Sequence, residues 1–388
     1  MTKRIGFLLS HPIQYYAPIF RELATRCDLT VLFAHRQTAE QQARAGFGRA
    51  FDWDVDLLSG YESRFLVNVA RQPSTDRFGG CDTPGVADEI AGGKFDAFVV
   101  PGWGLRSYLQ AAQACRRARV PVLVRGDSQL GGQRNLAVRL AKAVAFPHLL
   151  RRFDGFLYVG QRHREYLLHY GAPAHRMFFS PHCVDNDAFA AASAAARRKT
   201  AAPQGTTRIR RVLFVGKLIS RKHPADLLRA VARLPDRSVN VAFAGSGEQE
   251  GELRKIAAEI GVSADFLGFV NQSELPAVYA SADLLVLPSD GLETWGLVVN
   301  EAMACSLPAI VSDAVGCGPD LVVPGETGAT FPAGDVAALA SAIAGVLSLD
   351  SDLTRRHLAA KMAVYSPARA ASGIVDAMTT LADDGPLQ

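Results

Sequence analysis

The sequence predicts an α/β protein built from two doubly wound, mostly parallel sheets, one in each half of the chain. Three observations support this prediction. The 388 residues are enough for two domains with separate cores. Short apolar runs alternate with helix-like segments in both halves, which is typical of parallel sheets covered on both faces. An Ala- and Arg-rich stretch with few large apolar residues, which we interpret as a linker, lies between the halves at residues 191–208.

The first half, residues 1–190, contains six apolar runs that we expect to be strands. They are Ile5–Leu9, Leu29–Ala34, Phe95–Pro101, Val120–Arg125, Gly155–Val159 and Met177–Ser180. Because ligands of parallel sheets bind beyond the carboxyl ends of the strands, His11 and Asp127 are candidate site residues facing a cleft. The alternatives are that His11 lies incidentally at a helix start, with Pro12 in its first turn, and that Asp127 caps the next helix.

The second half, residues 209–365, repeats this alternation. Strands are expected at Arg211–Val215, Val239–Ala244, Phe266–Phe269, Asp283–Leu287 and Ala309–Ser312. Helices are expected at Pro224–Leu234, Glu250–Ile260, Glu274–Ser281, Leu297–Cys305 and Val336–Leu347. A final helix, Pro367–Leu381, falls within residues 366–388. The second half is therefore predicted to be a second doubly wound unit.

Composition narrows the class of protein. The chain is 48% hydrophobic and 21% charged, which are ordinary values for a soluble globular protein. A net charge of +4 is too small to indicate nucleic-acid binding, although it allows contact with phosphates or an anionic membrane face. Six cysteines without a C-x-x-C pair predict reduced, mostly buried thiols in a cytoplasmic protein. No apolar run reaches the ~20 residues that span a bilayer.

The most informative stretch runs from Leu287 to Pro308. A strand leads through a Pro-Ser-Asp-Gly turn and a loop into a helix, with Glu293 before the helix and Glu301 inside it. If the helix starts early, this spacing points both carboxylates towards one side. Amides at the helix N-terminus favour an anion. The stretch thus offers carboxylates that can accept hydrogen bonds from hydroxyl groups and amides that can donate to a phosphate. A nucleotide-diphosphate sugar requires both. The alternative is a buried βα unit with two solvated glutamates.

Two further segments follow strands of the second half. Residues 215–223, VGKLISRKH, bring Lys217 and Lys222 close together in sequence. Two ammonium groups near a diphosphate would stabilise the charge that grows on it as a leaving group; the alternative is a basic turn at a sheet edge. Residues 244–251, AGSGEQEG, superficially suggest a dinucleotide fingerprint, but the last glycine spacing is one residue too long.

These motifs together resemble a known family. Glu293-x7-Glu301 followed by Ala-Met-Ala resembles the donor-binding motif of bacterial family 4 glycosyltransferases, which have the GT-B fold. Residues 215–223 resemble the family's G-[RK]-L-x3-K-G segment, with His223 where Gly is common. Residues 181–185 resemble its P-N-G-V-D turn, which we interpret as structural. The resemblance covers nearly all of the second half and is looser in the first.

The resemblance implies an acceptor-binding Rossmann-like domain at residues 1–190 and a donor-binding one at 209–365. It also implies a final helix at 366–388 that packs back on the first domain. The implied enzyme is a retaining transferase that uses a UDP- or GDP-sugar and no metal or other cofactor. The implied acceptor is a sugar, a lipid-linked molecule or a small molecule, in bacterial glycan, glycolipid or natural-product biosynthesis. The base, the donor sugar, the acceptor and the oligomeric state stay open.

The resemblance also assigns roles at the site. Glu293 would bind the donor sugar, Glu301 the ribose, and both lysines, Lys217 and Lys222, the phosphates. The implied catalytic residues are Lys217, Lys222, Glu293, His11 and Asp127. The other implied donor-binding residues are Gly216 and Gly245 in glycine loops, Phe269 beside the base, and Thr294, Trp295, Gly296, Leu297 and Val298, whose amides meet the sugar and the β-phosphate.

Some alternatives remain open at this point. The protein could be an epimerase of the same fold acting on a nucleotide sugar, or a nucleotide-sugar binding protein without turnover. Asp52-Trp53-Asp54 matches a D-x-D metal motif, but its alternation fits a half-exposed strand in the first domain. The basic stretch Arg134–Arg152 fits a surface helix, and docking on the inner membrane face is its alternative.

Overall fold

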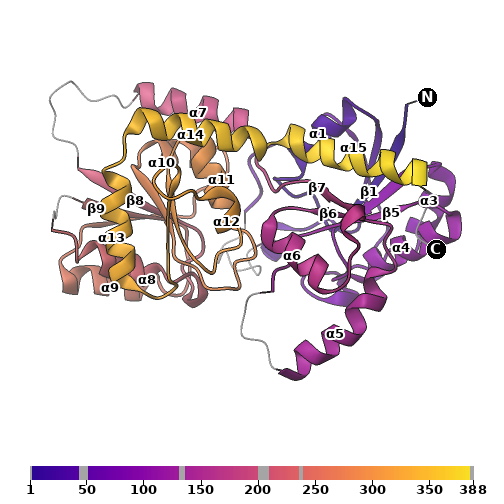
Figure 1. The fold of residues 1–388 in the computed structure, drawn as a ribbon, viewed down its shortest axis with the longest axis horizontal. Helices are drawn as coiled ribbons and strands as arrows, with labels where there is room; N and C mark the ends of the chain where they lie inside the picture. Colours follow the sequence, from indigo (N-terminus) through magenta and orange to yellow (C-terminus); the bar gives the residue numbers. More distant parts are fainter. Residues whose placement is uncertain (1, 43–50, 131–135, 200–208, 236–238, 385–388) are drawn as a thin grey trace. The chain divides into compact units, whose positions relative to one another are not determined.

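Two compact units make up the protein. The computed structural model describes residues 2–42, 51–130, 136–199, 209–235 and 239–384. The first unit comprises residues 1–41, 56–182 and 367–388, and the second comprises residues 42–55 and 183–366. Each unit is built on one sheet (Figure 1), and all the strand pairs within both sheets are parallel. The prediction of two doubly wound α/β units is therefore confirmed.

The sheet of the first unit has seven strands in the order β3-β2-β1-β4-β5-β6-β7. The strands are β1 (Arg4–Leu9), β2 (Asp28–Phe33), β3 (Glu62–Phe65), β4 (Ala97–Val100), β5 (Val122–Gly126), β6 (Gly155–Tyr158) and β7 (Met177–Phe179). Six of them match the predicted apolar runs. The sequence analysis missed β3, because this edge strand, Glu-Ser-Arg-Phe, is half exposed and carries charges, as edge strands commonly do.

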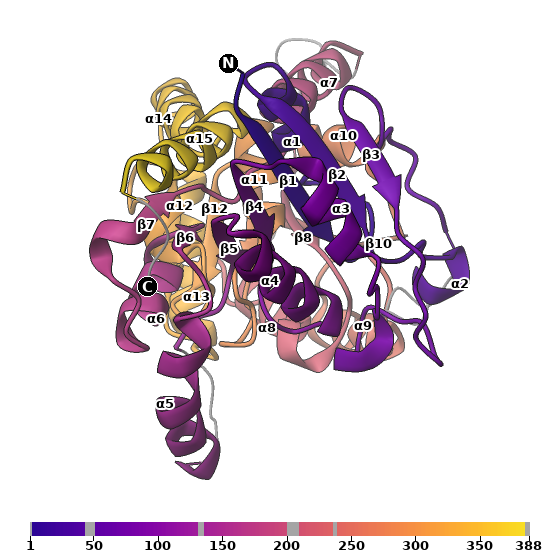
Figure 2. The same ribbon diagram turned by 90° about the vertical axis from the view of Figure 1, so that its right-hand side faces the viewer.

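Helices cover both faces of this sheet. They are α1 (Ala17–Ala24), α2 (Ala39–Gln42), α3 (Val86–Gly93), α4 (Arg106–Ala118), α5 (Leu136–Leu150), α6 (Gln161–His169) and α15 (Pro367–Asp384), with 3-10 turns η2 (Phe78–Gly80) and η3 (Ala174–Arg176). Residues of α3, α4 and α6, such as Ile90, Tyr108 and Leu167, share one core with the strands. Helix α15 packs on α1, β6 and β7, so the predicted return of the final helix to the first unit is confirmed. In both views α5 extends away from the sheet (Figure 1, Figure 2).

The sheet of the second unit has six strands in the order β10-β9-β8-β11-β12-β13. The strands are β8 (Arg210–Val215), β9 (Val239–Ala244), β10 (Ala264–Gly268), β11 (Leu284–Leu287), β12 (Ala309–Ser312) and β13 (Gly328–Phe331). Five of them match the predicted strands. The sequence analysis missed β13, a short edge strand whose sequence, Gly-Ala-Thr-Phe, has no continuous apolar run.

Five of the described helices of the second unit match predicted positions, whereas Asn186–Lys199, Gly318–Leu321 and Ser351–Val364 were not among the predicted helices. The helices of this unit are α7 (Asn186–Lys199), α8 (Pro224–Val231), α9 (Glu250–Ile260), α10 (Leu275–Ala280), α11 (Leu297–Ala304), α12 (Gly318–Leu321), α13 (Val336–Leu347) and α14 (Ser351–Val364), with the 3-10 turn η4 (Ser220–Lys222). Helices α8, α9 and α13 share a core with the sheet, and α7 packs on α10 and α11. Residues 191–199 of the stretch interpreted as a linker thus belong to α7, and residues 200–208 lie outside the described residues.

Two observations concern the chain as a whole. All six cysteines are free and buried, as the sequence analysis expected. Among the described residues no single helix is long and apolar enough to cross a membrane. One pair, Val336–Leu347 with Ser351–Ala382, meets the length and composition criteria only when its members are combined across a 105° bend.

Candidate active site

Two glycine loops follow β8 and β9 and pack backbone to backbone. Gly216 has φ +142° and Gly245 has φ +143°, conformations that L side chains rarely adopt. The N–H of Leu218 donates to the carbonyl of Ser246 at 3.0 Å, which joins the loops. A Cβ atom on Gly245 would overlap the carbonyl of Gly216, and one on Gly247 would overlap that of Leu218. The glycines therefore let these loops close against each other at the carboxyl ends of their strands.

The two lysines predicted to bind phosphates lie on the turn between β8 and α8. Lys217 is partly buried beside Gly216, and Lys222 ends the 3-10 turn η4. The ammonium of Lys222 forms an ion pair with the carboxylate of Glu293, and these side chains are only 12% and 14% exposed. The structure thus brings together a predicted phosphate ligand and a predicted sugar ligand that are 71 positions apart in sequence.

The segment departs from the family pattern at His223, where Gly is common, and the backbone at this position shows what the departure costs. His223 has a left-handed backbone, with φ 50° and ψ 42°, and it precedes the first residue of α8. This conformation costs a residue other than glycine about 1–2 kcal/mol. The Nδ1 atom of His223 lies 3.5 Å from Oδ2 of Asp226. The backbone therefore requires the conformation that glycine adopts most easily, and this chain places a histidine there.

The loop that carries Glu293 is fixed by the segment after β12. The N–H of Gly316 donates to the carbonyl of Glu293 at 2.9 Å, and the N–H of Cys317 donates to the carbonyl of Trp295 at 3.0 Å. A Cβ atom on Gly316 would overlap the carbonyl of Thr294. The three residues before Gly296 are therefore held at their backbone, and the loop presents Glu293 from a fixed support.

Helix α11 starts at the end of this loop. Gly296, with φ +100°, precedes the helix and provides no side-chain cap. The first amides of the helix, at Leu297 and Val298, therefore have no cap or intrahelical partner and favour an anion. The side chain of Trp295 is buried and donates from Nε1 to Oδ1 of Asn300 at 2.8 Å, so it holds the loop to the helix.

Glu301 lies inside α11 and is buried. Its carboxylate accepts hydrogen bonds from the hydroxyl of Tyr279 at 2.6 Å and from Nε2 of Gln272 at 3.4 Å. Burial raises the pKa of Glu301 to about 6, although both hydrogen bonds oppose this shift. Because α11 begins at Leu297, Glu293 lies outside the helix. The early helix start that would point both carboxylates to one side does not occur, and the loop and the helix place them separately.

Phe269, predicted to lie beside the base, directly follows β10. Its ring centroid is 4.4 Å from that of Phe51, a buried residue of the second unit. The N–H of Gly245 donates to the carbonyl of Gly268 at 2.7 Å. The loop that carries Phe269 is therefore joined both to the glycine loop after β9 and to the segment around Phe51.

The Asp52-Trp53-Asp54 segment differs from its sequence prediction in two ways. It forms no strand, and it belongs to the second unit rather than the first. Asp54 accepts hydrogen bonds from the N–H of Ser273, at 3.1 Å, and from its hydroxyl. Asn271 donates from Nδ2 to the carbonyl of Asp52 at 2.9 Å. The segment differs from its prediction because Asp52 and Asp54 are hydrogen-bonded to the turn before α10 and do not pair with a strand.

Within the described residues, no group of three or more His, Cys, Asp and Glu side chains is arranged to hold a metal ion. Both carboxylate oxygens of Asp54 accept hydrogen bonds from Ser273, so the D-x-D pattern does not fit a metal site here. That the enzyme needs no metal stays a prediction from the resemblance.

In the first unit, polar side chains gather where β5, β6 and β7 end. Oδ2 of Asp127 lies 3.8 Å from Nε2 of His182, and the ring of Tyr15 lies edge-on to His182 at 5.4 Å. Burial lowers the pKa of His182, whereas its hydrogen bond with Asp127 raises it. Burial also lowers the pKa of His163 to about 3. The described residues that follow Asp127, 128–130, form no helix, so Asp127 does not cap a helix there and that alternative is wrong.

His11 follows β1, and its Nδ1 atom is hydrogen-bonded to Oγ of Ser10 at 2.9 Å. Burial, with a smaller contribution from nearby His35, lowers the pKa of His11 to about 4. The imidazole is therefore neutral near pH 7. The expectation that His11 and Pro12 begin a helix is wrong, because α1 starts at Ala17.

Two histidines of this unit were not among the predicted site residues. His182 lies in the segment that we interpreted as a structural turn, although its position after β7 at the same sheet edge was a usable signal. His163 lies within α6, and nothing in its sequence surroundings distinguishes it from a surface helix residue.

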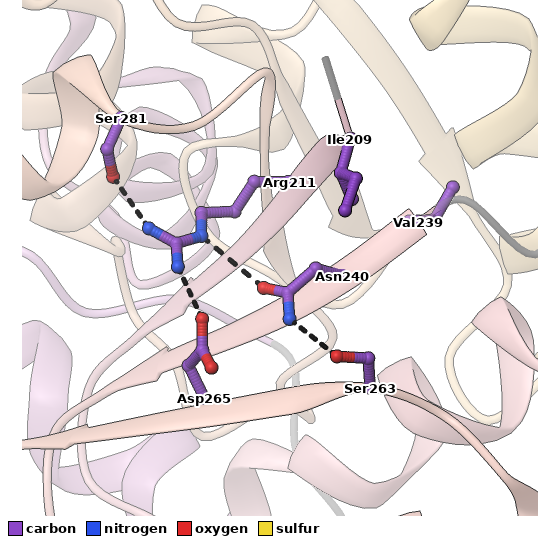
Figure 3. Close-up of a pocket in the computed structure, with 7 residues that line it drawn as sticks. All are labelled: Ile209, Arg211, Val239, Asn240, Ser263, Asp265 and Ser281. Atoms are coloured by element: carbon purple, nitrogen blue, oxygen red, sulfur yellow. Dashed lines mark hydrogen bonds and ion pairs between the residues drawn. The ribbon is translucent and has the colours of Figure 1, made fainter. Parts of the chain in front are cut away.

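A pocket of about 400 Å³ lies at the other end of the second sheet, where β8, β9 and β10 begin. Figure 3 shows that its polar side chains already bind one another: Arg211 pairs with Asp265 and donates to Asn240 at 3.3 Å, and Asn240 donates to Ser263 at 3.0 Å. Ligands of parallel sheets bind at the carboxyl ends of the strands, where the glycine loops are. This pocket is therefore not the candidate active site.

Comparisons with known proteins point to the same part of the chain. Residues 197–363 match the family model described as Glycosyl transferases group 1. The chain is similar to D-inositol 3-phosphate glycosyltransferase from Mycobacterium sp. (strain KMS), with 38% identity over 190 residues that cover 47% of this chain and 42% of that protein. It is also similar to glycogen synthase from Mycobacterium tuberculosis (strain CDC 1551 / Oshkosh), with 35% identity over 176 residues that cover 44% and 42%. The chain spans less than half the length of these relatives.

The fold is similar to that of Anabaena HepE, solved in complex with UDP, with a TM-score of 0.70, 18% identity and coverage of 98% of this chain and 100% of that chain. At this identity the likeness shows the fold alone. The matched residues 197–363 include both lysines and both glutamates of the motifs described above. By this match, residues 197–363 belong to the group 1 glycosyltransferases, family 4, and by its two parallel sheets and returning final helix the chain has the GT-B fold.

Proposed function

We propose that this protein transfers a sugar from a UDP- or GDP-sugar to an acceptor hydroxyl, with retention of the anomeric configuration. The observation that carries the proposal is the shielded ion pair between Lys222 and Glu293, in the loop that leads into α11. A cation, a hydroxyl acceptor and uncapped helix amides are the groups that a nucleotide-diphosphate sugar requires. The complex of HepE with UDP supports testing uridine nucleotides first.

The phosphates are the first part of the donor to be bound. Lys217 and Lys222 neutralise the diphosphate, and the amides of Leu297 and Val298 donate to the β-phosphate. These groups stabilise the charge that grows on the diphosphate as the glycosidic bond breaks, so their effect is larger in the transition state than in the ground state. A metal ion is not needed in this scheme, because the lysines supply the positive charge.

Carboxylates bind the sugar rings on either side of the diphosphate. Glu293 accepts hydrogen bonds from donor-sugar hydroxyls, and Thr294 lies beside it in the same loop. Glu301 accepts from the ribose hydroxyls, and Phe269 lies beside the base. The glycine loops at Gly216 and Gly245 lack side chains that would obstruct the nucleotide.

Retention follows when the acceptor attacks the face from which the diphosphate leaves. The bond between the anomeric carbon and the β-phosphate oxygen breaks, the acceptor oxygen bonds to that carbon, and the leaving phosphate oxygen takes the acceptor's proton. This scheme forms no covalent intermediate on a side chain. Isolation of a glycosyl-enzyme from a reaction quenched during turnover would contradict it.

The acceptor is assigned to the first unit. In this proposal residues 1–190 bind the acceptor, residues 209–365 bind the donor and 366–388 return to the first domain, while residues 191–199 of the predicted linker 191–208 belong to α7 of the second unit. Asp127 and His11 lie at carboxyl ends of strands of the first sheet, where an acceptor hydroxyl would be bound. The named relatives differ in acceptor, since one is an inositol phosphate glycosyltransferase and another a glycogen synthase, so the acceptor class is open.

We also propose a cytoplasmic location with peripheral contact at the inner membrane face. The six free, buried cysteines fit a reducing compartment. Helix α5 exposes Leu140 and Val144 alongside Arg139, a combination suited to an anionic lipid surface. Co-sedimentation with vesicles that contain anionic lipid tests the proposed membrane contact. Leu140→Asp should reduce the fraction of protein that sediments with the vesicles.

A panel of nucleotide sugars tests the proposed function. The protein is incubated with UDP- and GDP-sugars, and release of free nucleotide diphosphate is measured with and without candidate acceptors. Slow donor hydrolysis that an acceptor accelerates is the expected result. Isomerised sugar without an acceptor would indicate the epimerase, and tight binding without any release would indicate a binding protein.

A further inference from the structure

Both hydrogen-bond donors of the Glu301 carboxylate come from one short element. Tyr279 lies on α10 and is fully buried, and Gln272 lies on the turn that precedes α10. The turn is closed by Asn271, whose carbonyl accepts from the N–H of Leu275 at 3.1 Å. The orientation of this carboxylate therefore depends on where α10 and its entry turn lie.

The turn before α10 is itself bound by residues 51–54, a segment from much earlier in the chain. The residues on either side of Gln272 bind residues 51–54: Asn271 donates to the carbonyl of Asp52, and Ser273 donates twice to Asp54. These residues are 219 positions apart in sequence. Phe51 adds a buried ring contact with Phe269, two positions before Asn271.

We propose that residues 51–54 are a positioning element of the nucleotide site, which fixes the turn before α10 and thereby aims Gln272 at the carboxylate of Glu301. This inference rests on the proposed function, in which Glu301 receives the ribose hydroxyls. Gln272 lies between two residues that are both hydrogen-bonded to the segment, and its own N–H donates to Oδ1 of Asn271 at 2.9 Å. The same residues that resemble a D-x-D metal motif thus support nucleotide binding through hydrogen bonds.

The test compares ligands that differ only in the ribose hydroxyls. The dissociation constants of UDP and GDP, and of the 2′,3′-dideoxy analogue of whichever binds, are measured by calorimetry for the full chain and for Asp54→Ala. Loss of these hydrogen bonds is expected to raise the dissociation constant of the ribonucleotide about three- to tenfold. The dideoxy analogue should bind wild type and Asp54→Ala equally, because it makes no bond to Glu301.

Three further variants separate positioning from general damage. Asp376→Ala removes an exposed aspartate from α15, outside residues 51–54, so its affinity should match wild type. Asp54→Asn retains an acceptor for the N–H of Ser273 and should recover most of the lost affinity. Gln272→Ala should reproduce the effect of Asp54→Ala, and the double variant should lose little more than either. Melting temperatures show that each variant is folded.

Equal weakening of the ribonucleotide and its dideoxy analogue would overturn this inference, as would an unchanged ribonucleotide affinity in Asp54→Ala. Either result leaves the proposed function intact, because wild type still binds the nucleotide. Failure of wild type to bind either UDP or GDP would overturn both.

Discussion

The candidate donor site and the candidate acceptor site are built from different parts of the chain. In the second unit the site consists mainly of backbone: glycine loops with positive φ, a carbonyl-bonded loop and the amides of a helix N-terminus. In the first unit it consists of side chains from separate strand ends, such as Asp127 and His182. A backbone site needs particular residues at fixed spacing, whereas a side-chain site needs only that distant residues meet.

This difference determines what can be changed in each site. Removing a donor-side residue disturbs either the fold of a loop or a shielded charge pair. Removing an acceptor-side residue leaves the backbone unchanged and alters only the chemistry at the end of the sheet. Mutations in the two units should therefore separate donor binding from acceptor use, and the following predictions test that separation.

The largest effect is expected from breaking the Lys222–Glu293 pair. Lys222→Ala and Glu293→Ala should each lower the turnover number about 10²–10³-fold, as loss of a transition-state charge contact does. Because both side chains are shielded, each single variant should also melt earlier, with a double variant less destabilised than the sum. Lys255→Ala, which removes a lysine from α9 whose side chain is 77% exposed, is the control. Turnover within threefold of wild type in either single variant would count against the donor assignment.

The next largest effect concerns the glycine loops. Gly247→Ala should lower the free energy of unfolding by at least about 2 kcal/mol, because its Cβ atom would overlap the backbone of Leu218. Gly251→Ala is the matched control: it lies in α9 with open space around it and should raise the free energy of unfolding by about 0.5–1 kcal/mol. Denaturant unfolding followed by circular dichroism measures both. Equal stability of the two variants would show that the loops are not closely packed.

An acceptor-side change should have a smaller and different effect. Asp127→Asn keeps the shape of the side chain but removes its charge beside His182. We expect kcat/KM for the acceptor to fall about tenfold or more, while the dissociation constant for the nucleotide stays within about twofold of wild type, because the proposed nucleotide contacts come from residues of the second unit. Steady-state kinetics with the acceptor found in the nucleotide-sugar panel, together with calorimetry, provides both numbers. A change in nucleotide affinity alone would instead place Asp127 on the donor side.

A pH dependence of a few-fold is expected from Glu301. Burial raises the pKa of this carboxyl from 4.5 to about 6, so the folded protein takes up a proton before the unfolded chain does as the pH falls. Its contribution to the free energy of unfolding therefore decreases as the pH rises from about 4.5 to 6. Ribose hydroxyls need the ionised carboxylate as acceptor, so affinity for a nucleotide sugar should fall as the pH drops below about 6. Glu301→Gln should flatten this profile, and an unchanged profile in that variant would assign the dependence to another group.

The smallest effect is expected at His223. Glycine adopts the left-handed backbone of this position without the steric cost, although it loses more entropy on folding. His223→Gly should therefore raise the free energy of unfolding by up to about 1 kcal/mol without changing nucleotide affinity. Thermal unfolding monitored by calorimetry detects a change of this size. A lower melting temperature would show that the contact with Asp226 outweighs the backbone strain.

The motifs of the second unit could be recognised in the sequence far better than those of the first unit, and the same physical difference explains why. Strands with apolar residues on both faces, and glycines that a backbone conformation requires, leave local patterns that can be identified without a structure. The edge strands β3 and β13 leave no such pattern. The meeting of His182 with Asp127 could not be predicted from either segment alone, because it depends on the order of strands in the sheet.

The segment around Asp54 shows most clearly where prediction from local sequence patterns fails. Its alternating acidic and apolar residues predicted a strand of the first unit, yet it binds the turn before α10 in the second. Contacts 219 positions apart decide its structure, and no local pattern encodes them.

The most direct test is a crystal structure of the protein with a bound UDP- or GDP-sugar. The account predicts that the diphosphate lies within hydrogen-bonding distance of Lys217, Lys222 and the first amides of α11, with Glu301 at the ribose. A nucleotide bound elsewhere, for example in the pocket beside Arg211 where β8, β9 and β10 begin, would contradict it.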